Sequence, residues 1–139
     1  MVGDYQVAID EATAFLNIAK SCAVDVGEFL SGKMYPFAVN ASLSCELFTK
    51  AIMIKRSPTN EFKRGHDLKI LYNTLESNDK VAIELLYKNK CVKPLSELLD
   101  ESGNAFVEWR YALENRVSIN VTGIIAFAEA LREYNKTIV

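Results

Sequence analysis

The chain has 139 residues, of which 50% are apolar and 24% are charged, proportions typical of one soluble globular domain and unlike those of a disordered or fibrous protein. Its formal net charge of −2 argues against the wide basic surface that non-specific binding along DNA requires. One local basic cluster remains, and its commonest interpretation is a solvated helix end and loop: Lys55, Arg56, Lys63 and Arg64.

The cysteines and the single histidine do not form a metal-binding or disulfide pattern. Cys22, Cys45 and Cys91 are odd in number, widely spaced and without a CxxC pair, so we expect reduced thiols, a cytoplasmic location and no bound metal or cofactor. The first residues lack the basic start and apolar run of a signal peptide. We also expect no apolar stretch of the roughly 18–20 residues that span a membrane.

A long amphipathic helix is predicted to begin at Asp4, whose carboxylate can accept hydrogen bonds from the free amide groups of a first helical turn. Apolar residues then recur at steps of three and four, which predicts one buried stripe: Tyr5, Ile9, Ala12, Leu16, Ala19, Ala23, Val26 and Leu30. Ser31 and Gly32 are suited to end this helix.

A second helix, with Pro36 in its first turn, is predicted over Phe37–Lys55. It is apolar on most sides and rich in small side chains, so it should be the central and most buried helix. Glu46 and Lys50 lie one turn apart in the order that favours an ion pair. Pro58 then ends the helix.

Two shorter helices follow. The first is predicted to start after a cap at His66 or Asp67 and to contain Leu68, Leu71, Tyr72 and Leu75. The next, capped by Asn78 or Asp79 and closed by the basic segment 88–90, is predicted to turn these residues inward: Val81, Ala82, Leu85 and Leu86.

Three helical segments complete the chain. Pro94 begins a piece through Leu99, a helix resumes over Ala105–Asn115, and Asn120 caps a last helix through Tyr134. That last helix is predicted to bury Ile124, Ala128 and Leu131. We interpret Val117–Val121 as a connection between helices, since no alternating strand pattern of useful length occurs. The prediction is one all-α domain over residues 1–139, a bundle of about five or six helices with an up-and-down core and short additional helices.

His66 is the first candidate for chemistry, because histidine titrates near neutral pH and serves as acid, base or ligand. Its commoner use beside Asp67 would be structural, as a capping or hydrogen-bonding residue that anchors the loop. No further ligands point to a metal site, and no Ser or Cys has the sequence setting of a catalytic nucleophile. Glycine-rich phosphate loops are absent from the sequence as well.

The second candidate is the segment that contains Trp109, Arg110 and Tyr111, with Glu114 and Arg116 close behind. Two arginines and two aromatics near a helix end could hold a phosphate and stack a base. The more frequent alternative packs the tryptophan in the core and pairs Arg110 with a carboxylate, such as that of Glu46, Glu114 or Asp67.

The order of these features resembles the HEPN domain, the "higher eukaryotes and prokaryotes nucleotide-binding" family of helical bundles. The resemblance spans nearly the whole chain and is carried by a Glu-x-x-x-Lys on the second helix, a His-Asp-Leu at the head of the third and a later Arg-Tyr: Glu46 and Lys50, His66 to Leu68, and Arg110 with Tyr111. It implies a ligand site containing Glu46, Lys50, His66, Asp67, Trp109, Arg110 and Tyr111, and a homodimer.

Many HEPN proteins are metal-independent ribonucleases of toxin–antitoxin and defence systems, with an Arg-x(4–6)-His active site. Arg110 and Arg116 have no histidine downstream, so the motif is missing and no catalytic residue is assigned. The resemblance therefore implies a non-catalytic module that binds a nucleotide, RNA or a partner protein such as a nucleotidyltransferase. Two alternatives stay open: a divergent ribonuclease that uses His66 with Arg110 or Arg116, and a purely structural helical adaptor.

Overall fold

The computed structural model describes residues 1–22, 34–103 and 121–138. These residues form six helices: α1 (Tyr5–Cys22), α3 (Met34–Arg56), α4 (Leu68–Asn73), α5 (Ser77–Lys88), α6 (Leu95–Ser102) and α8 (Val121–Thr137). Within the described ranges, extended pairing is limited to one isolated bridge between Val2 and Glu61. The predicted all-α bundle with short additional helices is confirmed.

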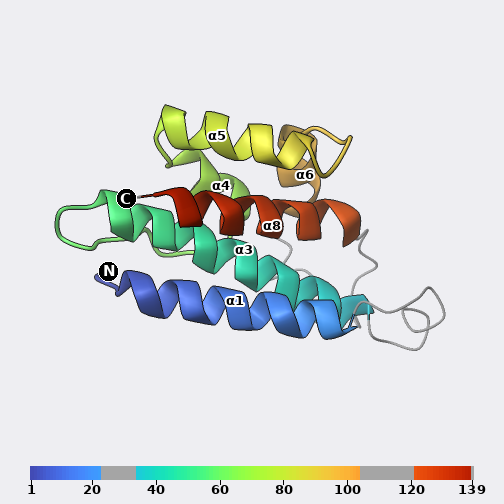
Figure 1. Ribbon diagram of the computed structural model, residues 1–139, viewed down its shortest axis with the longest axis horizontal. Helices are drawn as coiled ribbons and strands as arrows, with labels where there is room; N and C mark the ends of the chain where they lie inside the picture. The colour runs from blue at the N-terminus through green and yellow to red at the C-terminus, as the bar shows by residue number, and fades with distance from the viewer. Residues whose placement is uncertain (23–33, 104–120, 139) are drawn as a thin grey trace.

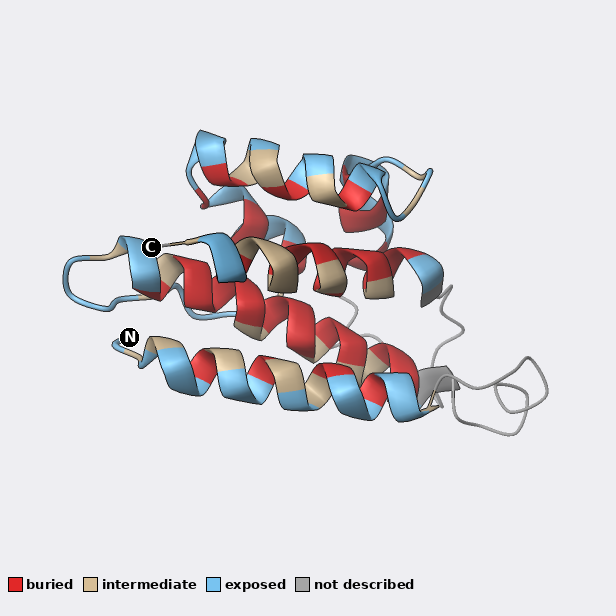
Figure 2. Cartoon of the chain, in the orientation of Figure 1, coloured by how far each residue is buried: buried red, intermediate tan, exposed pale blue. Residues whose placement is uncertain are grey.

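Helix α3 forms the centre of the bundle, with α1 along one side and α8 along the other, while α5 covers α8 (Figure 1). Figure 2 shows α3 buried over most of its surface, whereas α1 and α5 are buried along one stripe each. Small side chains on α3, among them Ala38, Ala41 and Cys45, have no exposed surface and allow the neighbouring helices to approach closely. The prediction that this is the central helix is confirmed.

Helix α1 begins as the sequence predicts. The Asp4 carboxylate accepts a hydrogen bond from the backbone N–H of Val7 at 2.9 Å. The buried stripe contains Ala12 and Leu16, and the Ser44 hydroxyl on α3 donates to the Ala12 carbonyl at 2.8 Å. The predicted continuation through Ala23, Val26 and Leu30 to the stop at Ser31 and Gly32 lies outside the described residues.

Helix α3 runs from Met34 to Arg56, so Pro36 stands in its first turn and Pro58 follows its end. By length and composition alone, one helix of the described residues, Pro36–Arg56 with a mean hydropathy of 1.3, could cross a membrane, and the expectation that no stretch is long and apolar enough is wrong. However, 67% of that stretch is buried inside the bundle, and the core helix of a soluble protein has the same composition.

Helix α4 begins after Asp67, which caps it by accepting from the backbone N–H of Lys69 at 3.0 Å and of Ile70 at 3.2 Å. The helix ends at Asn73, two residues before Leu75, which the sequence places within it. Leu75 is nevertheless buried, because the turn after the helix folds back onto the core.

Helix α5 differs from the prediction in its start and in the face that it buries. The cap position is Glu76, not Asn78 or Asp79. Two residues predicted to face inward are exposed, Val81 at 58% and Leu85 at 60%, while Asp79, Ile83 and Tyr87 are buried. Asp79 lies on the same buried face as Ile83 and Tyr87, and it forms an ion pair there.

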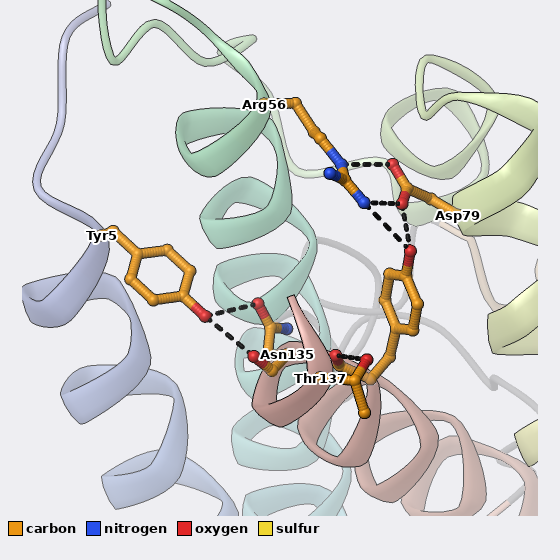
Figure 3. A network of polar contacts seen from close by, with 6 residues as sticks. Tyr5, Arg56, Asp79, Asn135 and Thr137 are labelled. Carbon is orange, nitrogen blue, oxygen red and sulfur yellow. Dashed lines mark hydrogen bonds and ion pairs between the residues drawn. The ribbon is translucent and has the colours of Figure 1, made fainter. Parts of the chain in front are cut away.

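That ion pair joins Arg56 at the end of α3 to Asp79, and the Tyr134 hydroxyl on α8 donates to the same carboxylate. On the other side of α8, the Tyr5 hydroxyl donates to the Asn135 carbonyl at 3.0 Å. Figure 3 shows both contacts at the C-terminal end of α8. Adjacent residues of α8 therefore link it to α5 and α3 on one side and to α1 on the other.

The last part of the bundle follows the prediction closely. Helix α6 begins after Pro94, and α8 buries Ile124, Ala128 and Leu131 as expected. Helix α8 continues to Thr137, three residues past the predicted end. The predicted cap Asn120 and the predicted helix at 105–115 lie outside the described residues.

Candidate functional site

The candidate site is centred on the carboxylate of Glu46, which is 3% exposed in the middle of α3. Its Oε2 atom lies 3.2 Å from the Lys50 ammonium, and its Oε1 atom lies 2.7 Å from Nδ1 of His66. The predicted ion pair is thus confirmed, and it is buried, as is most of this helix. One carboxylate oxygen contacts the Lys50 ammonium and the other contacts the imidazole of His66. Glu46 therefore connects α3 to the loop that carries the only histidine of the sequence.

The segment 57–67, called here the α3–α4 loop, brings His66 to Glu46. Gly65, immediately before the histidine, has a φ of +122°, a conformation that disfavours any residue with a Cβ. The loop is also tied to the N-terminal segment, since Gly3 donates to the Asn60 carbonyl and Phe62 donates to the Met1 carbonyl, each at 2.9 Å. The backbone therefore fixes where the imidazole lies.

Lys50 is a nearly buried cation with two neighbours. Its ammonium faces the Glu46 carboxylate and lies 5.6 Å from the centre of the Phe62 ring. A carboxylate and an aromatic face both offset part of the cost of removing an ammonium from water. Phe62, which the sequence did not single out, thus joins the site from the α3–α4 loop.

Asp67 and His66 have different roles, although the sequence offered both as caps. Asp67 caps α4, and its Oδ1 atom accepts both hydrogen bonds that define the cap. His66 is instead held by Glu46, and its side chain is 51% exposed. The interpretation of a histidine that anchors the loop agrees with this contact, and the imidazole also reaches the surface.

The basic cluster noted in the sequence separates into two halves. Arg56 binds Asp79, and the Lys55 ammonium lies 5.0 Å from the centre of the Tyr5 ring. Lys63 and Arg64 are exposed, and no carboxylate among the described residues pairs with either. Two exposed cations therefore precede His66 in the α3–α4 loop. In the sequence, this basic pair is visible between Phe62 and the histidine.

The structure brings Lys50 and His66 into contact with Glu46, while Asp67, next to His66 in the chain, caps α4. The other candidates, Trp109, Arg110 and Tyr111, lie outside the described residues, as do Glu114 and Arg116. The contacts of that part of the site therefore stay a prediction.

The described residues offer little to a metal or to thiol chemistry. No group of three His, Cys, Asp or Glu side chains that could hold a metal ion occurs among them. The three cysteines are free thiols, and burial raises the pKa of the Cys45 thiol, so that it stays protonated. What the site offers chemically is an imidazole held by Glu46, in a loop that also carries two exposed cations, Lys63 and Arg64.

Comparison with known proteins adds no relative: no protein-family model, no curated protein and no solved structure matches this chain. The HEPN resemblance therefore rests on the residues quoted for it in the sequence.

Proposed function

We propose that this chain is a non-catalytic HEPN-like module that binds a nucleotide or a short single-stranded RNA at the α3–α4 loop. The observation that carries the proposal is the exposed pair Lys63 and Arg64, without an acidic partner among the described residues, beside an imidazole that Glu46 holds in place. Cationic side chains and imidazole N–H groups bind phosphate oxygens through charge-assisted hydrogen bonds.

The family resemblance supports the same proposal. Three of the residues that carry it, Glu46, Lys50 and His66, meet in one cluster at the side of this loop. The missing Arg-x(4–6)-His motif supports binding without cleavage. In keeping with the resemblance, the proposal includes a cytoplasmic homodimer that acts in a toxin–antitoxin or defence system, with a nucleotidyltransferase as a candidate partner protein.

The test is a titration of the protein with a fluorescent single-stranded RNA at several salt concentrations. Replacing both Lys63 and Arg64 by Gln should weaken binding at least tenfold and reduce the slope of log K against log salt by about 0.7 for each phosphate that the variant no longer neutralises. A matched control replaces Lys88 and Lys136, also exposed, by Gln and should leave binding unchanged. Absence of RNA and nucleotide binding in the parent protein would instead favour the adaptor.

A second function, divergent ribonuclease activity, is favoured by one specific contact. The Glu46 carboxylate lies 2.7 Å from Nδ1 of the half-exposed His66. A carboxylate in this position can orient an imidazole that acts as a general base. The proposed catalytic partner, Arg110 or Arg116, lies outside the described residues. Cleavage of mixed RNA that is lost in His66→Gln, but retained in Lys88→Gln, would establish this function and exclude the non-catalytic one.

A further inference from the structure

A pocket of about 320 Å³ opens beside the Glu46 cluster, between the N-terminal segment, α1 and α3. Its walls are mostly apolar and include Val7, Leu47, Ile54 and Phe62. This volume is at the lower end of the range, about 300–1,000 Å³, in which proteins bind small molecules. A flat group of one or two rings therefore fits it better than a larger ligand.

Lys50 supplies hydrogen-bond donors to this pocket. The residue lines the pocket, is 9% exposed and, among the described residues, donates one hydrogen bond, to Glu46. An ammonium group has three donors. A buried cation with unused donors favours a ligand that brings acceptor atoms on an otherwise apolar body.

Glu11 supplies acceptors to the same pocket. Glu11 lines the pocket from α1, the residue is exposed, and no cation in the described part of the chain pairs with it. Asp4 also lines the pocket, but its carboxylate is already engaged as the cap of α1. The pocket thus presents a donor, Lys50, and a two-oxygen acceptor, Glu11, within apolar walls.

We propose that this pocket takes the base of the bound nucleotide and that guanine is the base it matches best. Guanine carries the acceptors O6 and N7 for Lys50, and the donors N1–H and N2–H₂ for both oxygens of Glu11. Phe62 forms a wall for the ring. Lys63 and Arg64, next in the chain, bind the phosphate. The inference rests on the proposed function and adds base identity to it.

The other bases match less completely. Adenine and cytosine carry one exocyclic amino group but no ring N–H beside it, so one oxygen of Glu11 would be left without a donor. Uracil offers a single ring N–H. A bidentate pair discriminates between bases by about 1–3 kcal/mol, which corresponds to roughly 5- to 150-fold in affinity. Guanine should therefore bind at least about fivefold more tightly than the others.

The experiment is isothermal titration of the full chain with GMP, AMP, UMP and ribose 5-phosphate. The parent protein should prefer GMP, and Glu11→Gln should reduce the preference for GMP over AMP to less than threefold. The matched control is Asp10→Asn, the neighbouring carboxylate, which accepts from Gln6 at 2.9 Å and does not line the pocket. This control should keep the full preference.

A second variant tests the pocket without touching a charge. Val7→Trp places a large ring at the pocket from a residue that is already 52% exposed, so the fold should tolerate it. Val81→Trp, at a 58% exposed position on α5, is its control. Val7→Trp should bind GMP no more tightly than ribose 5-phosphate, while Val81→Trp should behave like the parent.

The possible failures are distinguishable. Equal affinity for all four compounds, or a GMP preference that survives both Glu11→Gln and Val7→Trp, overturns the base pocket while the phosphate site stands. If none of the four compounds binds and single-stranded RNA does not bind either, both the proposed function and this inference are wrong.

Discussion

The Asp79 carboxylate accepts two hydrogen bonds from the guanidinium of Arg56, one of 2.7 Å from Nη2 to Oδ1 and one of 3.2 Å from Nε to Oδ2. The Asp79 side chain is 1% exposed and that of Arg56 38%. This two-point contact joins the end of α3 to the first turn of α5, and the Tyr134 hydroxyl on α8 adds a third donor (Figure 3). It thus positions three helices at once.

Replacing Asp79 by Asn should lower the free energy of unfolding by about 2–3 kcal/mol, because a buried amide cannot match the charged hydrogen bonds of a carboxylate. The loss stays below that of a fully buried pair, since Arg56 can turn toward water. Urea unfolding followed by circular dichroism measures it.

Asp100→Asn is the control for this change. Asp100 pairs with Lys69 at 2.6 Å, but its side chain is 58% exposed, so the unfolding midpoint should not move measurably. If both variants unfold at the same urea concentration as the parent, the Arg56–Asp79 pair does not hold α5 in place.

The same pair predicts a pH dependence. Burial raises the pKa of the Asp79 carboxyl, but the hydrogen bonds from Arg56 and Tyr134 and the attraction of the guanidinium outweigh burial, so the pKa lies below its ordinary value. A lowered folded-state pKa gives stability that is present above the unfolded-state pKa, about 3.9, and is lost as the pH falls through the folded-state value.

The difference in the free energy of unfolding between the parent and Asp79→Asn should therefore have its largest value above about pH 5 and decrease below about pH 4. Urea midpoints of both proteins measured from pH 7 down to the acid limit of folding give this difference directly. A difference that stays constant over the whole range would show that Asp79 is not the group that titrates.

The Glu46–Lys50 pair should show strong coupling in a double-mutant cycle. Glu46→Leu leaves the buried Lys50 ammonium without its carboxylate, and Lys50→Met leaves the buried Glu46 carboxylate with His66 as its remaining partner among the described residues; each change alone should cost about 2–4 kcal/mol. The double variant removes both charges from a site where the side chains are 4% and 11% exposed, so it should be more stable than either single variant.

Strictly additive losses in this cycle would show that the two residues do not depend on each other. Lys20 and Glu129 form an ion pair whose side chains are 42% and 24% exposed, which makes it the matched comparison. The coupling measured there should be much smaller, because water screens a pair at the surface.

Gly65→Ala should disturb the site without a steric clash. A Cβ at this position would meet no atom within 4 Å, so the expected loss of about 1–3 kcal/mol comes from the positive φ alone. Because His66 is the next residue, the proton resonances of its ring should shift as well. Lys63→Ala, in the same loop but without a positive φ, should change neither stability nor the histidine signals.

Much of the fold could be predicted because its signals are local. Apolar residues at steps of three and four predicted α1 and α8, and a segment that is apolar on most sides predicted α3. Asp4, Pro58 and Pro94 marked boundaries that the structure confirms. The face of α5 could not be predicted, since apolar side chains lie on several of its sides. The buried face contains Ile83 and Tyr87 together with Asp79, whose partner Arg56 lies 23 positions away in the chain.

For the site, the sequence by itself determined the Glu46–Lys50 pair, because one helical turn brings residues four apart together whatever surrounds them. It also narrowed the cap of α4 to His66 or Asp67. Only the tertiary structure decided that the pair is buried, that Asp67 takes the cap and that His66 binds Glu46 across 20 positions. Such a contact depends on how a loop packs against a helix. The spacing of two residues along the chain does not predict that packing.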